Sequence, residues 1–304
     1  MKTQMQEYMK VGIVQFLAYP TTMQGEGPVL ESVVALASDS FFNAMEVTHI
    51  ADDTVRAAVA DFLLRAKVEP YFCAQPLTLL PGLDLEDADE AQRQAAIDAV
   101  KAGIDEAVEI KSNYVSVMSG KNTPDKAAAT ERLIDSLKQL CAYAKPHGIS
   151  LSIEPFDQLS YGKDCLIGPT KDAVRLSKAV RRDYPNFGLL IDLAHLCLLQ
   201  EDIKHALKLA GQHLVHVHLA NAAGADPSNP YYGDNHPYFG ASGTCNDTSQ
   251  IVECLKTLKE MGYISKSSRG IVSFEVKPDT ANGDTPESII AGAKRTLLDA
   301  WAQV

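Results

Sequence analysis

Four acidic or imidazole residues in the second half of the chain each stand near the end of a short apolar run. They are Glu154 in ISLSIEPFD, Asp192 in FGLLIDLAH, His218 in HLVHVHLAN and Glu275 in GIVSFEVKP. Three carboxylates and one imidazole that converge would offer mostly oxygen ligands, which favours Mg²⁺ or Mn²⁺ and remains compatible with Co²⁺ or Zn²⁺. Carboxylates so close together would repel one another without a cation. The pattern therefore predicts a site for a divalent metal.

Each of these runs has the length and the β-branched content of a strand, and a helix-like stretch follows it. Strand and helix alternate in the same way through the first half of the chain, which indicates a parallel sheet. If the sheet closes into a barrel, the four side chains point inward at the end where such barrels keep their active sites. The predicted strands of the first half are residues 11–16, 44–48, 68–74 and 114–118, and the predicted helices are residues 26–38, 53–67, 89–109, 123–145, 170–183, 200–210, 248–261 and 286–302.

The predicted fold class is therefore α/β, with a single (β/α)8 barrel over residues 1–304 and an extended loop after the seventh strand. No composition break suggests a second domain. Because a strand places every second side chain on one face, Ser152, His216 and Ser273 should face inward below the predicted site. Small or polar side chains suit a layer that supports a site.

Further polar residues stand where they could bind a substrate. His195 lies three residues after Asp192, in DLAH, and could contact substrate, hold a second metal or orient Asp192. His49 ends the second predicted strand, and Lys277 lies two residues past Glu275. Each has an ordinary alternative, namely a polar residue that starts a helix, a partly buried histidine and a solvated lysine.

The longest irregular segment, residues 221–247, follows the seventh strand and is rich in Gly, Pro, Asn and Asp. A loop of this length in a compact domain is usually functional or disordered. Its GDNH stretch places Asp234 and His236 two residues apart as further candidates for substrate binding, although an ordinary turn would explain them as well. Its aromatic side chains predict an ordered loop that covers the site: Tyr231, Tyr232, Tyr238 and Phe239.

Composition limits the classes of function. The chain has 304 residues and a net charge of −11, which disfavours non-specific binding to nucleic acid or to an anionic membrane surface. No run approaches about 18 apolar residues, and the amino terminus has no apolar signal core, so we expect a cytoplasmic protein without a membrane span. The six cysteines show no CxxC spacing and several lie in apolar stretches, which predicts free, buried thiols.

The motifs IEPFD, DLAH, HVHLAN and SFEVKP resemble those of the xylose-isomerase-like barrel superfamily, and the resemblance covers nearly the whole chain. In its ketose 3-epimerase branch, the residues that match Glu154, Asp192, His218 and Glu275 hold one divalent metal, usually Mn, Mg or Co. The resemblance implies that Glu154 and Glu275 also form the acid/base pair and that His195 contacts substrate. It further implies a homodimer or homotetramer. This chain has an insertion between His218 and Asp234.

The resemblance and the residues together predict a metal-dependent sugar isomerase or epimerase. One glutamate would remove a proton beside a carbonyl, the other would return a proton, and a metal ion, with Mn²⁺ as first expectation, would stabilise the enediolate. A small sugar or keto-sugar is the expected substrate, with no nucleic acid and no membrane as partner.

Three alternatives remain open. The stretch YYGDNHPYFG with SFEVKP resembles the large subunits of bacterial lyases that cleave 3-keto C-glycosides with a small partner subunit; there the enolate would expel a group β to the abstracted proton. An abasic-site endonuclease would share many of the same residues, but it also has histidines where this chain reads Cys73-Ala74-Gln75 and Met118-Ser119. A non-catalytic binding module is the last alternative, and the metal content of the purified protein would separate it from the enzymes.

Overall fold

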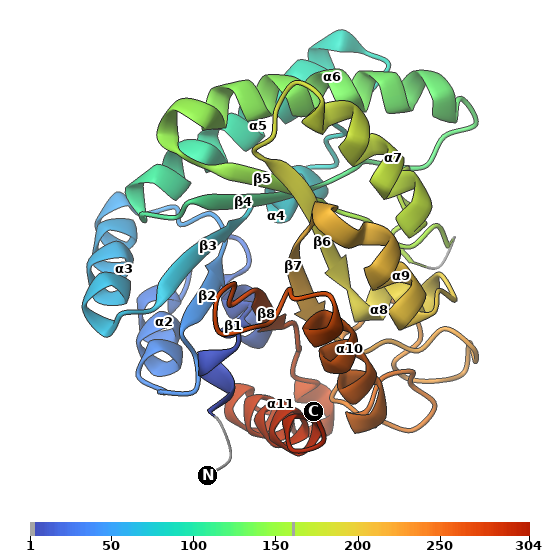
Figure 1. Cartoon of the computed structure of the whole chain (residues 1–304). Coiled ribbons are helices and arrows are strands. Elements are labelled where there is room, and N and C mark those ends of the chain that lie inside the picture. Colours follow the sequence, from blue (N-terminus) through green and yellow to red (C-terminus); the bar gives the residue numbers. More distant parts are fainter. Residues whose placement is uncertain (1–3, 160–161) are drawn as a thin grey trace.

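The computed structural model describes residues 4–159 and 162–304. Its eight strands form one parallel sheet in the order β1-β8-β7-β6-β5-β4-β3-β2. Val14, next to β1, forms a single parallel bridge with Glu46 of β2, so that the sheet curls into a nearly closed barrel (Figure 1). The strands are Lys10–Ile13 (β1), Ala44–Val47 (β2), Glu69–Cys73 (β3), Tyr114–Met118 (β4), Ser150–Glu154 (β5), Phe187–Asp192 (β6), Leu214–Leu219 (β7) and Ile271–Phe274 (β8). The predicted (β/α)8 barrel is confirmed.

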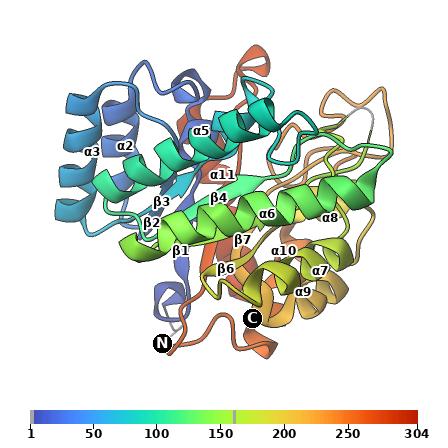
Figure 2. The ribbon, with the colours of Figure 1, turned by 90° about the horizontal axis from the view of Figure 1, so that it is seen from above.

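Helices surround the strands (Figure 1), and α5 and α6 lie side by side along one flank of the barrel (Figure 2). Each buries an apolar stripe against the sheet; in α5, Ile97, Val100 and Ile104 are fully buried, and Asp89 caps the first turn by accepting from the Ala91 amide. The outer helices are Val29–Ala37 (α2), Asp53–Ala66 (α3), Glu90–Glu109 (α5), Lys126–Ala144 (α6), Thr170–Arg181 (α7), Ile203–Ala210 (α9), Thr248–Glu260 (α10) and Pro286–Trp301 (α11).

Three short helices follow strands and were not predicted: Gln15–Ala18 (α1), Gln75–Leu79 (α4) and Leu193–Leu198 (α8). The first strand therefore ends at Ile13, and the apolar residues of α1 imitate a longer strand because apolar content alone does not separate the two states. The segment 75–88, which lies between a predicted strand and a predicted helix, begins with α4. The sixth predicted helix, residues 200–210, corresponds to α9, with α8 before it. Short 3₁₀ turns complete the described elements: Met5–Glu7, Pro20–Thr22, Lys145–His147, Gly211–His213 and Thr280–Asn282.

The barrel interior beneath the carboxyl ends of the strands is packed with small or polar side chains. A Cβ atom at Gly12 of β1 would collide with the Ser273 hydroxyl, so glycine leaves the space that this layer needs. The predicted inward residues Ser152, His216 and Ser273 are each fully buried. The buried residues of the layer are Glu46, Cys73, Ser116, Ser152, His216 and Ser273.

The prediction of six free thiols was wrong for two cysteines. Cys197 of α8 and Cys245 of the loop 221–247 form a disulfide, with their Cα atoms 6.1 Å apart. The two are separated by 48 residues, so only the docking of the loop on α8 brings them together. The remaining cysteines are free and buried: Cys73, Cys141, Cys165 and Cys254. Among the described residues, no helix is both long enough and apolar enough to cross a membrane.

Candidate active site

The four residues predicted to hold a metal meet at the carboxyl ends of four neighbouring strands. Glu154 and Asp192 are the last residues of β5 and β6, His218 lies in β7, and Glu275 directly follows β8. The register pairs Asp192 with His218, and the side chains of all four offer ligand atoms that lie within 4.8 Å of one another. Parallel strands of similar length bring their ends to one edge of the barrel, which is why sequence position alone could place this cluster.

Each of two carboxylates in the cluster has one oxygen held by the protein and one without a partner. Gln75 Nε2 donates to Glu154 Oε2 over 2.8 Å, and the Ala194 amide donates to Asp192 Oδ1 over 2.7 Å. Glu154 Oε1 and Asp192 Oδ2 are buried and accept no hydrogen bond from any described residue. Buried oxygens without donors are costly unless another ligand satisfies them. This arrangement fits a divalent cation.

The imidazole of His218 completes the cluster. Its Nδ1 lies 2.6 Å from Glu275 Oε2 and 3.7 Å from Glu154 Oε1. One imidazole with three carboxylates is a donor set that suits Mn²⁺ or Mg²⁺ and tolerates Zn²⁺ or Co²⁺.

The protein environment separates the proton affinities of the two glutamates. Burial, together with the charge of Glu275, raises the pKa of Glu154 to about 8. Burial likewise raises the pKa of Asp192 well above its ordinary value. Burial also acts to raise the pKa of Glu275, but the imidazoles of His236 and His218 outweigh it and lower that pKa to about 2. Without a cation the cluster therefore retains protons, which a cation would displace on binding.

The loop 221–247 brings Asp234 and His236 to this cluster. His236 Nε2 lies 2.9 Å from Asp234 Oδ1 and 3.9 Å from Glu275 Oε1. Lys163 Nζ lies 3.1 Å from Asp234 Oδ2 on the far side of that carboxylate. Burial opposes the charge on His236, yet Asp234 and Glu275 raise its pKa to about 10. The loop thus adds an imidazolium and a carboxylate beside Glu275.

The other predicted substrate-binding residues differ in position. His195 of α8 is buried, its ring centroid lies 4.2 Å from that of Phe156, and its Nε2 is 3.8 Å from Glu154 Oε1. Lys277 lines the cavity in front of the cluster. His49 does not line that cavity, because its Nδ1 pairs with Glu106 Oε1 of α5 at 2.5 Å.

The cavity in front of the cluster has a volume of about 280 Å³ and two unlike sides. One side is lined by charged or titratable residues: Glu154, Lys163, His218, Asp234, His236, Glu275 and Lys277. Apolar residues from α1, α4 and the segments near them form the other, and Leu79 and Leu80 are 38% and 50% exposed at its edge. The apolar lining consists of Val14, Phe16, Leu17, Met23, Pro76, Leu79, Leu80 and Phe156. The predicted aromatic cover is not part of it: Tyr238 is 43% exposed, and Phe239 packs in the core.

Sequence reasoning missed three residues of the site: Glu46, Gln75 and Lys163. Glu46 binds the far side of His218, with Oε2 2.8 Å from Nε2. The single charge inside the four-residue run AMEV was a signal that could have identified it, because a charge within a buried strand needs a partner. Gln75 and Lys163 stand in connecting segments, where no periodicity predicts their direction.

A model described as the xylose isomerase-like TIM barrel family matches residues 34–298. Among curated proteins, the fructoselysine 3-epimerase of Shigella flexneri is 25% identical over 149 residues, which are 48% of this chain and 52% of that protein. The fructoselysine 3-epimerase of Escherichia coli O157:H7 is 24% identical over a stretch of the same length. The chain thus matches about half the length of these relatives.

Solved structures share the fold over almost the whole chain. A D-tagatose 3-epimerase-like protein superposes with a TM-score of 0.70 at 19% identity, covering 96% of this chain and 99% of its own. The protein IOLI, solved with a bound zinc atom, superposes with a TM-score of 0.73 at 20% identity, and the match covers 97% of this chain and 99% of IOLI. An L-ribulose 3-epimerase superposes with a TM-score of 0.69 at 17% identity, and the match covers 97% of this chain and 92% of that protein.

Proposed function

The chain belongs to the xylose isomerase-like TIM barrel family, and we propose that it is a divalent-metal-dependent sugar epimerase or isomerase. The observation that carries this proposal is the convergence of Glu154, Asp192, His218 and Glu275, with two buried carboxylate oxygens that no described residue satisfies. The curated relatives, both fructoselysine 3-epimerases, support a reaction on a ketose or a ketose derivative.

A divalent cation held by these four residues would polarise a substrate carbonyl and stabilise the negative charge that develops on its oxygen. We take Mn²⁺ as the first candidate, with Mg²⁺, Co²⁺ and Zn²⁺ as alternatives, because three of the four ligands are carboxylates. The zinc atom in the IOLI structure is consistent with a divalent ion in this fold.

The two glutamates would move the proton. Glu275 is kept ionised by the imidazoles of His236 and His218, so it is in the form that can accept a proton from the carbon beside the carbonyl. Glu154 is the more readily protonated of the two glutamates, because burial and the charge of Glu275 raise its pKa, and it would return a proton from its own side of the cavity. Return to the same carbon inverts its configuration, and return to the former carbonyl carbon isomerises the sugar. The two carboxyl groups belong to β5 and to the end of β8, so they approach the substrate from different strands.

The surrounding polar groups would bind hydroxyls of the substrate. His195 has two ring nitrogens without hydrogen-bond partners among the described residues, so it can donate to or accept from a substrate hydroxyl. His236, held by Asp234, and Lys277 line the cavity in front of the cluster. A homo-oligomer and a cytoplasmic location remain predictions from the sequence.

Proton exchange tests this proposal. The Mn²⁺-loaded protein is incubated in D₂O with free ketoses and with fructoselysine, and each substrate is followed by NMR and mass spectrometry. Deuterium beside the carbonyl of one substrate, together with a new epimer or isomer, is the expected result. Protein treated with a chelator serves as the control and should show no exchange. If the loaded protein exchanges no ketose, the proposal is wrong and cleavage of abasic DNA becomes the next assay.

The apolar side of the cavity favours a second candidate, the lyase that cleaves 3-keto C-glycosides. Proton abstraction beside the keto group would be followed by expulsion of an aromatic carbon leaving group, and the apolar residues of α1 and α4 would pack against that group. A small partner subunit would be required. Adding an aryl 3-keto C-glycoside to the same assay distinguishes the two, because the lyase releases the free aglycone and the epimerase does not.

A further inference from the structure

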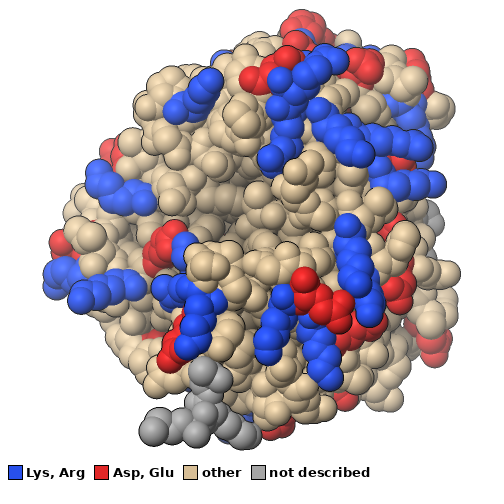
Figure 3. All heavy atoms as spheres, in the orientation of Figure 1, with Lys and Arg blue, Asp and Glu red and all other residues tan. Residues whose placement is uncertain are grey.

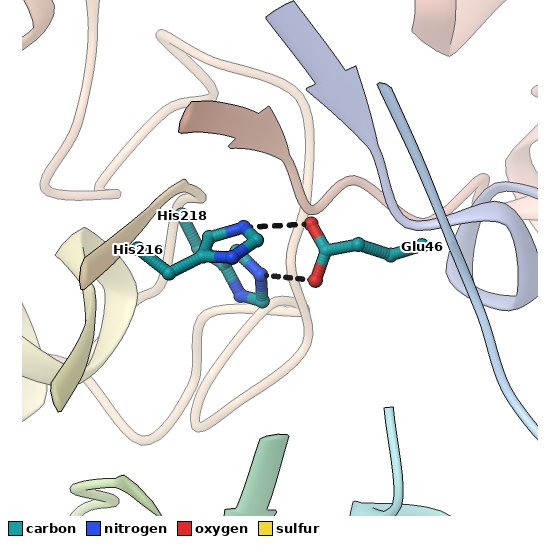
Figure 4. A group of neighbouring side chains, drawn as sticks. All are labelled: Glu46, His216 and His218. Carbon is teal, nitrogen blue, oxygen red and sulfur yellow. Dashed lines mark hydrogen bonds and ion pairs between the residues drawn. The ribbon is translucent and has the colours of Figure 1, made fainter. Parts of the chain in front are cut away.

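Glu46 lies in the barrel beneath the proposed metal site and contacts it through one histidine. The residue is fully buried, and it comes from β2, on the opposite side of the barrel from the four proposed ligands. Its Oε2 is 2.8 Å from His218 Nε2, and its Oε1 is 3.0 Å from His216 Nε2. Figure 4 shows the two imidazoles directed at the two oxygens of this one carboxylate.

The contact with Glu46 decides which nitrogen of His218 can bind a metal. A carboxylate oxygen only accepts hydrogen bonds, so the Nε2 atom beside it must carry the proton. Without a cation, Nδ1 also faces carboxylates, Glu275 at 2.6 Å and Glu154 at 3.7 Å, and so carries a proton as well. A cation held by those carboxylates would replace the proton on Nδ1 and leave Nε2–H on Glu46. A histidine that binds a metal through one nitrogen commonly donates its other N–H to a carboxylate in this way.

The second imidazole fixes the carboxylate itself. His216 Nε2 also lies 3.2 Å from Ser273 Oγ, and its ring packs against the rings of Tyr71 and Tyr114, with centroids 5.4 Å and 5.1 Å away. Both oxygens of Glu46 are therefore engaged, one by each histidine. The carboxylate cannot rotate away from His218 without breaking its contact with His216.

We propose that Glu46 is a positioning residue for the metal: it holds His218 with Nε2–H towards the barrel interior and Nδ1 open to the cation. This inference rests on the proposed metal site. Glu46 acts only through His218, so its loss should weaken binding of the metal before it affects the proton-transfer step. Partners of this kind typically change metal affinity by about 10–100-fold.

The substitution Glu46→Gln tests the proposal with little change in volume. The amide has a single oxygen, so it can accept from only one of the two imidazoles, and its NH₂ group must face the other. The expected result is Mn²⁺ affinity about 10–100-fold weaker in a calorimetric titration. Saturating Mn²⁺ should recover most of kcat, because the carboxylates that move the proton remain in place.

The matched control is Ser152→Ala. Ser152 is fully buried in the same interior layer and shares a hydrogen bond of 2.5 Å with the Tyr114 hydroxyl, and among the described residues it has no hydrogen bond to Glu46 or His218. A general weakening of the barrel interior would lower the stability of both variants without a selective loss of metal affinity. We expect S152A to bind Mn²⁺ within about twofold of the wild-type protein, since a positioning effect requires contact with the ligand.

The outcomes separate the two proposals. If the wild-type protein binds no Mn²⁺, the proposed function fails together with this inference. If wild-type protein and E46Q bind Mn²⁺ equally, the inference alone is wrong. Should E46Q not fold, ¹⁵N-histidine NMR of the wild-type protein loaded with Zn²⁺ decides: His218 should carry its proton on Nε2, and a proton on Nδ1 would overturn the proposal.

Discussion

The carboxyl ends of β5–β8 and those of β1–β4 form two halves of one barrel mouth with opposite chemistry. The β5–β8 half carries Glu154, Asp192, His218 and Glu275, which are charged or titratable and lie within reach of one another. The β1–β4 half presents the apolar side chains of α1 and α4. An apolar wall lowers the local dielectric constant and so strengthens the electrostatic interactions of the charged half. Under the proposed function, one half would supply the chemistry and the other the environment in which it works.

Two of the side-chain hydrogen bonds that cross between the halves reach proposed metal ligands, and in both the partner residue lies on the β1–β4 side. Gln75 holds Glu154 at 2.8 Å, and Glu46 holds His218 at 2.8 Å. In each case the second polar atom of the partner side chain faces the charged cluster. This atom is Oε1 in Glu154 and Nδ1 in His218. Polar residues of the β1–β4 half therefore orient two residues of the charged half.

The largest effect should follow loss of a carboxylate in the charged half. Glu154→Gln and Glu275→Gln each remove a proposed proton-transfer group, and we expect kcat at saturating Mn²⁺ to fall about 10²–10⁴-fold. The rate of deuterium exchange into the substrate measures this fall in kcat. The control is Glu106→Gln, which also breaks a contact between a glutamate and a histidine, His49, but outside the cavity, and it should leave kcat unchanged. Wild-type exchange rates in E154Q would assign the proton transfer to other groups.

A buried carboxyl group of the β1–β4 half provides the second test, because no imidazole is described beside it. Glu86, in the segment between α4 and α5, is 3% exposed, and neither of its oxygens has a hydrogen-bond partner among the described residues. Burial raises its pKa from 4.5 to about 8, whereas the imidazoles of the other half lower that of Glu275 to about 2. Between pH 4.5 and 8 the folded protein keeps a proton on Glu86 that the unfolded chain has lost.

Glu86 should therefore make the free energy of unfolding fall as pH rises through this window, and Glu86→Gln should remove this contribution while those of Glu154 and Asp192 remain. At pH 5 the two proteins should be about equally stable, and at pH 9 E86Q should be more stable by on the order of 4 kcal/mol. Urea denaturation across pH 5–9 measures the difference. Glu131→Gln, at an exposed site on α6, is the control and should follow the wild-type curve. Parallel curves for E86Q and the wild-type protein would show that burial does not hold the proton on Glu86.

The charged half was predictable from sequence because each of its four residues ends an apolar run, and strand ends meet at one edge of a barrel. The apolar half was not. Phe16, Leu17 and Ala18 continue the apolar pattern of β1 but belong to α1, because hydrophobicity alone does not reveal where the chain turns. The orienting residue Glu46 stands 172 positions from His218, and only the folded barrel brings them together.

His49 and Glu46 show the limit of the same reasoning. Both lie on or just after β2, and the sequence favoured His49 because histidine at a strand end is typical of a site. The structure turns His49 towards Glu106 of α5 and Glu46 towards the barrel interior. A four-residue strand is too short for periodicity to indicate which face is inward, so the choice between neighbouring polar residues depends on helix packing that no local pattern encodes.

The smallest expected effect concerns the apolar wall. Leu79 is 38% exposed and lines the cavity, so Leu79→Ala should cost little stability but remove a surface that a bound apolar group would cover. Burial of about two methylene groups is worth roughly 1–1.5 kcal/mol, so KM for a substrate with an aromatic or alkyl substituent should rise about 5- to 10-fold with kcat unchanged. Leu64→Ala, at a 72% exposed site on α3, is the control.

The same variant distinguishes the two candidate functions. A free ketose has hydroxyls along its whole length and gains little from Leu79, so its KM should be the same in L79A and in the wild-type protein. If KM changes for substituted substrates only, the wall recognises a substituent, and the division between a charged half and an apolar half extends to the substrate itself. If KM changes for neither, Leu79 only borders the cavity, and the wall serves to exclude water from the charged half.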